Sequence, residues 1–253
     1  KIAKALALRE ALYSQPYYRL IHAEADQLPG LIIDRFSDLL VIQPNAAWVD
    51  QRLPALVAAL SDILKPSSIV VNGAGRARVL EGLDDARYMA LGEMPSDAIE
   101  VAMNGAVYFA DVAEGQKTGI FYDQRPNHKF VQDLAQGKSV LDVFSHVGGF
   151  GLAAMANGAA NVTCVDGSQP ALTLASRGAL ATRAETPFEA IKGDAFDVIG
   201  RHMIATLDER TSPGGQGQID RGTRAGSNSD EAFEFRCHPR ACGRLTGRHH
   251  QPN

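Results

Sequence analysis

The sequence has little of what marks secreted, membrane-spanning or strongly nucleic-acid-binding proteins. Three cysteines in 253 residues give no disulfide framework. No apolar run is long enough to span a bilayer, and no signal peptide opens the chain. The net charge of −4 supplies no overall positive field, so RNA contact would need a local basic patch. We therefore expect a cytoplasmic protein.

The length and the hydrophobic content of 45% allow two domains with cores of their own. Residues 1–97 are expected to form a small α/β domain, with successive helices and strands at Lys1–Gln15, Tyr18–Ala23, Leu31–Asp34, Leu39–Gln43, Trp48–Leu64 and Ser68–Asn72. Residues 98–200 begin with a predicted hairpin at Glu100–Asp111. Its turn is Asn104-Gly105, the preferred pair for a two-residue type I′ turn.

The stretch Ser139–Asp166 has the pattern of a nucleotide-binding βαβ unit. The short apolar run Ser139–Val143 predicts a buried strand, and the glycines within Gly148–Gly151 allow a sharp turn before a helix. The first N–H groups of that helix would point at a ligand above the turn. Asp166 ends the next strand about 20 residues later, where an acid can accept hydrogen bonds from ribose hydroxyls.

Two further acids favour S-adenosylmethionine as the cofactor. The strict G-x-G-x-x-G fingerprint of dinucleotide sites is absent. Asp142 lies on the first strand, and a carboxylate there suits a cationic cofactor without phosphates. Asp194 ends a third predicted strand in Ile191–Phe196, where it could face the adenine or cap the following helix. A nucleotide-dependent oxidoreductase is the alternative.

Three long strings match one family of enzymes. They are YYRLIHAEADQLPGLIIDRFSDLLVIQ (Tyr17–Gln43), YFADVAEGQKTGIFYDQRPNH (Tyr108–His128) and VLDVFSHVGGFG (Val140–Gly151). Through them the chain resembles the bacterial class I large-subunit ribosomal RNA cytosine-C5 methyltransferases that carry an N-terminal PUA domain. The resemblance covers about residues 1–200. The chain starts inside the family pattern, without the PUA domain, and departs from it after about residue 200.

The resemblance implies an α/β fold in which a small α/β domain precedes a Rossmann-like methyltransferase sheet, here incomplete at its C-terminal side. It also implies S-adenosylmethionine as cofactor and ribosomal RNA as partner. The segment Gly115–Asn127 would lie over the cofactor, with Arg125 on the methionine carboxylate and Asp123 orienting it. An internal Asp–Arg pair near the surface is the structural alternative. The predicted cofactor-binding residues are Phe121, Asp123, Arg125, Asp142, Phe144, Ser145, Gly148, Gly149, Phe150, Asp166 and Asp194.

A second polar cluster lies near the N-terminus. His22, Glu24 and Asp26 alternate along a segment expected to be extended, so they would share one face. Such spacing is weak support for a metal site. We interpret the cluster as a hydrogen-bonded structural network beside an RNA-facing surface.

Residues 201–253 do not have the pattern of the fold. From Asp208 onward the large apolar residues are limited to Ile219, Phe233, Phe235 and Leu245. Arginine and glycine are frequent and lysine is absent, so we expect a disordered or aberrant segment that adds no fourth strand. A reading-frame change is one hypothesis, and an arginine-glycine RNA-binding arm is the functional alternative. No standard zinc finger fits the spacing of Cys237, His238, Cys242, His249 and His250.

The resemblance also shows what is missing. The family adds a cysteine to C6 of cytosine and grips the base with an Asp-Pro-Pro motif, and neither element is found. Cys164 falls within a predicted strand, where a small buried hydrophobe is expected. Cys237 and Cys242 lie in the C-terminal segment. We assign no catalytic residue and expect a truncated or frame-shifted, inactive form, or a cofactor-binding module without catalysis.

Overall fold

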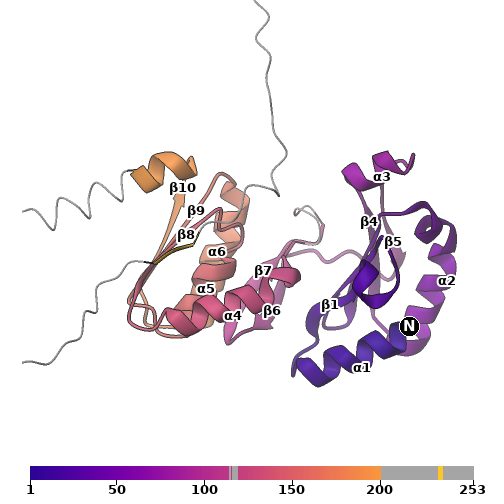
Figure 1. Ribbon diagram of the computed structural model, residues 1–253, viewed down its shortest axis with the longest axis horizontal. Coiled ribbons are helices and arrows are strands. Elements are labelled where there is room, and N and C mark those ends of the chain that lie inside the picture. The colour runs from indigo at the N-terminus through magenta and orange to yellow at the C-terminus, as the bar shows by residue number, and fades with distance from the viewer. Residues whose placement is uncertain (114, 116–118, 201–232, 236–253) are drawn as a thin grey trace, which may run out of the picture.

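The computed structural model describes residues 1–113, 115 and 119–200, together with the backbone of residues 233–235. Within these residues an N-terminal α/β part packs against a hairpin, which is followed by a second sheet and its helices (Figure 1). Across the described ranges, every helix is too short or too polar to cross a membrane.

The N-terminal part is built on a five-stranded sheet in the order β1-β2-β3-β4-β5. Its strands are β1 (Tyr17–His22), β2 (Leu31–Phe36), β3 (Leu39–Pro44), β4 (Ser68–Gly73) and β5 (Ala86–Leu91). Its helices are α1 (Ile2–Leu12), the 3-10 helix η1 (Ala23–Asp26), α2 (Ala47–Leu64) and α3 (Arg76–Leu80). Only β3 and β4 are parallel neighbours, because α2 carries the chain back between them. The four strands β1, β2, β3 and β4 were predicted, with ends that differ by no more than two residues. Helix α3 and strand β5 were not predicted.

Both faces of this sheet are buried, and alternate side chains serve the two faces. The core beneath α1 and α2 contains Leu40, Ile42, Ile69 and Val71. The core on the opposite face contains Phe36, Leu39, Val41 and Val70, and it continues through the hairpin into α5. This is why β3 and β4 are apolar along most of their length. The two parts of the chain therefore share one continuous hydrophobic core.

The expected hairpin forms from β6 (Ile99–Met103) and β7 (Ala106–Ala110). Asn104 and Gly105 have φ angles of 53° and 74°, and a type I′ turn requires positive values at both positions. After the hairpin come the 3-10 helix η2 (Tyr122–Gln124) and α4 (Arg125–Leu134). The segment Gly115–Asn127, predicted to lie over the cofactor, thus ends in helical structure. Pro126 lies in the first turn of α4, where its missing N–H is not needed.

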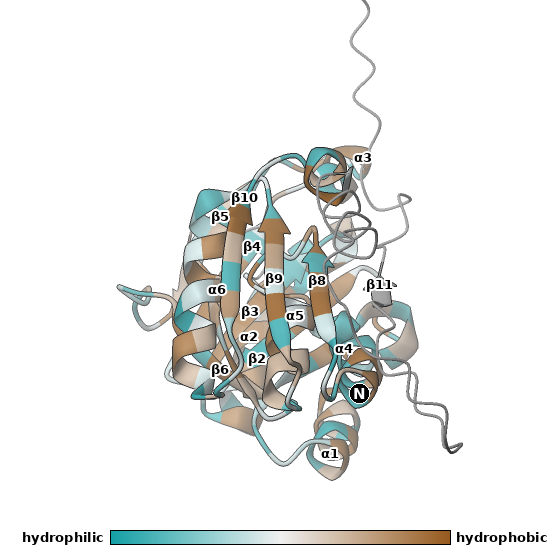
Figure 2. Ribbon diagram, turned by 90° about the vertical axis from the view of Figure 1, so that its left-hand side faces the viewer, coloured by the Kyte–Doolittle hydropathy of each residue, from teal (hydrophilic) through white to brown (hydrophobic). Residues whose placement is uncertain are grey.

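The second sheet has four parallel strands in the order β10-β9-β8-β11. Figure 2 shows β10, β9 and β8 side by side, with α5 and α6 behind them. The elements are β8 (Ser139–Val143), α5 (Gly149–Ala156), β9 (Asn161–Asp166), α6 (Gln169–Thr182) and β10 (Phe188–Lys192). The bounds of β8 are those predicted. The third strand ends earlier than predicted, and residues 195–200 are helical instead.

The expectation that residues 201–253 add no strand to this sheet is wrong for one short segment. β11 (Phe233–Phe235) pairs in parallel with β8, with Phe233 opposite Val140 and Phe235 opposite Asp142. Two phenylalanines around one acid have the alternation of a strand, but three residues are too few for a sequence pattern to stand out. The cysteines and histidines of that segment lie outside the described residues, as do residues 116–118.

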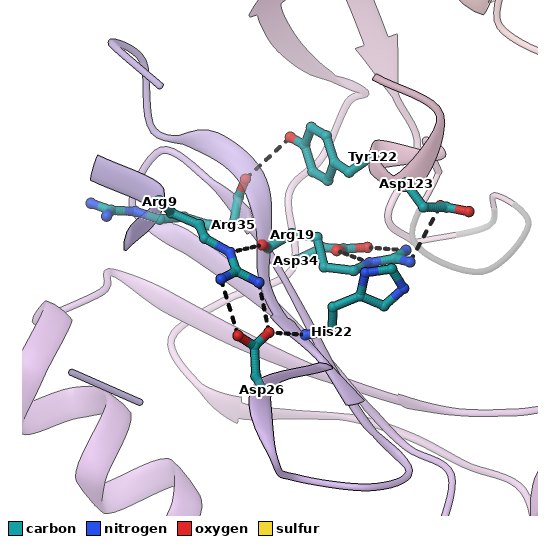
Figure 3. Close-up of polar contacts among 8 residues, drawn as sticks. All are labelled: Arg9, Arg19, His22, Asp26, Asp34, Arg35, Tyr122 and Asp123. Atoms are coloured by element: carbon teal, nitrogen blue, oxygen red, sulfur yellow. Dashed lines mark hydrogen bonds and ion pairs between the residues drawn. The ribbon is translucent and has the colours of Figure 1, made fainter. Parts of the chain in front are cut away.

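The expectation of one extended face for His22, Glu24 and Asp26 is also wrong. β1 ends at His22, and the two acids lie in η1. Asp26 accepts hydrogen bonds from the Arg9 guanidinium at 3.0 and 2.6 Å and from the His22 amide at 2.6 Å (Figure 3). This supports the interpretation as a structural network. In the part of the chain that the structure describes, no three His, Cys, Asp or Glu residues cluster as metal ligands.

The start of α5 is fixed by a buried acid on β8. Asp142 Oδ2 accepts a hydrogen bond of 2.8 Å from the amide of Gly151, and the amide of Phe150 also donates to this carboxylate. Gly151 is needed for the close approach, because a Cβ there would lie 2.6 Å from Sγ of Cys164. Burial raises the pKa of Asp142 to about 6.

This raised pKa predicts a pH-dependent stability. Between about pH 4 and pH 6 the native state binds the Asp142 proton more tightly than the unfolded chain, whose carboxyl has a pKa of about 3.9. The free energy of unfolding should therefore fall as the pH rises through this window, by about 3 kcal/mol. Asp142→Asn cannot ionise, so this decrease should be absent from urea unfolding curves of the variant. An equal decrease in both proteins would contradict the assignment.

Candidate cofactor site

A cavity of about 540 Å³ lies at the carboxyl ends of β9 and β10. Ligands of open parallel sheets bind at this edge. The cavity is lined by Phe144, Asp166, Gly167, Lys192, Gly193, Asp194 and Ala195. Three of these residues, Phe144, Asp166 and Asp194, were predicted from the sequence. The other four lining residues lie within two positions of Asp166 or Asp194 in the sequence. The positions of these two acids could therefore have been used to predict them.

Asp166 lies at the end of β9, as predicted, and its carboxylate is held by the main chain. Oδ2 accepts a hydrogen bond of 2.9 Å from the amide of His146, and Oδ1 accepts one of 2.8 Å from the amide of Ser168. A carboxylate has about four acceptor positions, so each oxygen can still accept a hydroxyl group. The arrangement therefore leaves Asp166 able to bind a vicinal diol in the cavity.

Asp194 and Phe144 form another part of the lining. Asp194 Oδ1 accepts hydrogen bonds from the amides of Phe196 at 2.9 Å and Asp197 at 3.3 Å, which confirms the predicted helix-capping role. Phe144 has a φ of 59° and an exposed fraction of 56%. Its ring meets Phe196 edge-on, with centroids 6.4 Å apart. An exposed aromatic ring at the cavity offers a stacking surface for a planar heterocycle.

The glycine turn joins β8 to α5. Gly148 has a φ of 81° and forms the N-cap of α5, a conformation that a Cβ would strain. Gly149 is crowded by the His128 ring, which would lie 2.7 Å from an added Cβ. From the sequence, these glycines were expected to allow close approach of a ligand. The structure adds a second reason, because the backbone conformation and the packing of the turn also require glycine at these positions.

The turn also carries buried polar atoms. Ser145 lies with its Oγ near the Cys164 thiol, and its amide donates to the carbonyl of Val165 at 3.0 Å. His146 has a φ of 51°, and burial lowers its pKa. Among the described residues, neither Oγ of Ser145 nor Nδ1 of His146 has a hydrogen-bond partner of standard geometry. Buried polar atoms are usually paired, and Ser145 has the Cys164 thiol beside it, so Nδ1 of His146 is the candidate for a ligand contact.

His146 was missed by the sequence reasoning, although it stands two residues before the predicted glycine turn. Two of the predicted aromatic residues pack around the histidines of this region. Phe121 meets the His146 ring edge-on at 5.1 Å between centroids, and Phe150 meets His128 at 4.6 Å. Burial lowers the pKa of His128 to about 4, so this ring is neutral at physiological pH.

Asp123 and Arg125 do not line this cavity. Asp123 pairs with Arg19 at 3.2 Å rather than with Arg125 as predicted. The Arg125 Nη1 donates to the carbonyl of Tyr17 at 2.8 Å, and its guanidinium lies over the ring of Tyr13. Both predicted residues instead line a second cavity, between α1, β1 and the start of α4.

Cys164 is buried in β9, as predicted, with none of its surface exposed. Burial raises the pKa of its thiol well above the usual range. A thiol that stays protonated and is sealed in the core cannot act as a nucleophile. Within the described residues, which hold no other cysteine, the site has no thiol for covalent catalysis.

Comparisons with known proteins agree with this architecture. A solved structure of a putative methyltransferase, SMU.776, complexed with SAH has a TM-score of 0.69 at 23% identity, covering 81% of this chain and 53% of that one. A putative SAM-dependent methyltransferase from Streptococcus mutans has a TM-score of 0.68 at 23% identity, covering 80% and 53%. These likenesses show the Rossmann-like fold.

Sequence relatives define the family. Ribosomal RNA large subunit methyltransferase I of Cronobacter sakazakii is 33% identical over 78% of this chain and 49% of its own length. The enzyme of that name from Yersinia pseudotuberculosis is 34% identical over 77% and 48%. The chain thus spans about half the length of these relatives. The S-adenosylmethionine-dependent methyltransferase family matches residues 26–183, which favours a methyltransferase over the oxidoreductase alternative. The chain belongs to the S-adenosylmethionine-dependent methyltransferase family.

Proposed function

We propose that the cavity at the ends of β9 and β10 binds S-adenosylmethionine through Asp166. The observation that carries the proposal is the free acceptor capacity of this carboxylate, which lines a cavity of about 540 Å³ at the expected edge of the sheet. That volume lies within the range of small-molecule sites, about 300–1,000 Å³. The buried Nδ1 of His146, which has no hydrogen-bond partner among the described residues, fits a polar ligand beside the turn. The cofactor supplies an electrophilic methyl group on its sulfonium.

Apart from Ser145, which lies beside the Cys164 thiol, and Asp123 and Arg125, which line the second cavity, the other predicted residues also have places in this proposal. Asp194 and Phe144 would contact the adenine, since both line the cavity beyond the ribose position. The glycine turn, with Gly148, Gly149 and Phe150, would face the methionine end, and Phe121 would cover it from the segment before α4. Asp142 would not contact the cofactor, because it is buried; it would support the site by holding the turn in place.

We infer that the substrate class is large-subunit ribosomal RNA, with cytosine C5 as the acceptor. The names of the sequence relatives support the RNA, and the resemblance of the three long strings supports the cytosine. C5 becomes nucleophilic only after a thiolate adds to C6. The one described cysteine, Cys164, is buried and protonated. We therefore propose that the described residues provide the cofactor half of the enzyme, and that this chain binds the cofactor without methylating RNA.

Replacing Asp166 tests the cofactor site. Asp166→Ala removes two charge-assisted hydrogen bonds to the ribose, worth about 2–4 kcal/mol, so S-adenosylmethionine should bind at least about tenfold more weakly. Isothermal titration calorimetry measures the affinity. Glu189→Ala, which removes an exposed acid from neighbouring β10, is the matched control and should bind as the wild type does. Equal affinities of wild type and Asp166→Ala, in folded protein, would refute the assignment.

A methyl-transfer assay tests the proposal that this chain binds the cofactor without methylating RNA. The purified chain should transfer no tritium from methyl-labelled S-adenosylmethionine to unmodified large-subunit ribosomal RNA, because no described thiol can reach C6. Calorimetric binding of the cofactor by the same preparation is the control that the site is intact. Detection of C5-methylcytosine in the RNA would show that this proposal is wrong.

A further inference from the structure

A second cavity, of about 470 Å³, lies between the N-terminal part and the start of α4. It shares no lining residue with the cofactor cavity. Side chains from α1, β1, η1, η2 and α4 line it, so it exists only because the two parts of the chain are packed together. Neither the family match nor the proposed cofactor site gives this cavity a role.

Two of the three arginines that line it are neutralised by acids. Arg9 pairs with Asp26 at 2.6 Å. Arg19 binds Asp34 at 2.9 Å and Asp123 at 3.2 Å, and Figure 3 shows its guanidinium between these two acids. These pairs fix the walls of the cavity but leave little positive charge for a ligand.

Arg125 differs from both. Its Nη1 donates to the Tyr17 carbonyl at 2.8 Å and its Nε lies 3.4 Å from Oδ1 of Asn104, and both acceptors are neutral. Within the described residues no carboxylate pairs with it. Burial lowers its pKa, as expected for a cation that has lost water without gaining a counter-ion. An anionic ligand would supply that counter-ion.

The same cavity has an aromatic wall. The Arg125 guanidinium lies 4.1 Å from the centroid of the Tyr13 ring. Tyr13 in turn stacks on Tyr18, with centroids 5.7 Å apart and the planes 24° from parallel. Leu8 and Leu12 line the cavity with 51% and 62% of their surface exposed. Apolar and aromatic surface beside an unpaired guanidinium is the combination that binds an unstacked nucleotide.

We propose that this second cavity binds one unstacked nucleotide of the RNA, with the phosphate on Arg125 and the base against Tyr13 and Leu12. A guanidinium can bind two phosphate oxygens with a planar fork. The Tyr17 carbonyl takes one N–H of Nη1 and Asn104 takes that of Nε, so the second N–H of Nη1 and both of Nη2 remain for a phosphate. The inference rests on the proposed RNA substrate and names the site that would hold it. It also moves Arg125 from the methionine carboxylate, its expected partner, to the RNA.

Fluorescence anisotropy with a fluorescein-labelled, single-stranded oligocytidine RNA tests the site in the full 253-residue chain. Arg125→Gln should weaken binding about tenfold and reduce the slope of log affinity against log salt by about 0.7, the value for one phosphate of a single strand. Leu12→Glu places a negative charge on an exposed position and should also weaken binding. The matched control is Arg177→Gln. Arg177 also lies over a ring, that of Phe109 at 4.3 Å, but is paired with Asp97 away from the cavity, so RNA binding should be unchanged.

Calorimetry with S-adenosylmethionine separates the possible outcomes. The Arg125→Gln variant should bind this cofactor as the wild type does. Loss of cofactor affinity with RNA affinity retained would overturn the inference and return Arg125 to the cofactor. Equal RNA affinity in wild type, Arg125→Gln and Leu12→Glu would also overturn it, while the proposed substrate would stand. Failure of the wild type to bind RNA while it binds the cofactor would overturn both the nucleotide site and the proposed RNA substrate.

Discussion

The hydrogen bond between the buried Asp142 carboxylate and the start of α5 is the contact on which the cofactor site depends. It fixes the turn after β8 from below. Because the turn is fixed, the amide of His146 reaches Asp166 at 2.9 Å and joins the end of β8 to the end of β9. The Asp166 carboxylate, which lines the cavity, is therefore oriented before any ligand binds. Gly151 makes this possible, since only hydrogen at that position fits against Cys164. The cost is a buried acid with a raised pKa.

A second constraint sets the position of the N-terminal part. One face of its sheet packs into the core that contains the hairpin and α5, so the two parts are held by a continuous apolar contact. At the edge of this contact, Arg19 of β1 bridges Asp34 of β2 and Asp123 of η2. Displacing one part against the other would separate Arg19 from Asp123 and break this ion pair, so the network opposes such a displacement. The second cavity lies beside this network, and its shape follows from the same packing.

The sequence predicted those elements whose signal is local. β8 has its predicted bounds because a short apolar run ends at a glycine turn, and the hairpin turn follows from the φ preferences of Asn104 and Gly105. Asp166 could be placed because strand, turn and helix lengths fix its position. Pairings between distant segments could not be predicted, as with β11 beside β8 or Asp123 beside Arg19. No local pattern encodes a partner many residues away, and resemblance to a family did not reveal which arginine remains unpaired.

The central claim is that Asp166 holds the ribose of S-adenosylmethionine at the carboxyl ends of β9 and β10. A crystal structure of this chain with S-adenosylhomocysteine tests it most directly. The account predicts both ribose hydroxyls within hydrogen-bond distance of the Asp166 carboxylate, with the adenine beside Phe144 and Asp194. A ligand bound with its ribose away from Asp166, or in the cavity beside Tyr13 and Arg125, would contradict the account.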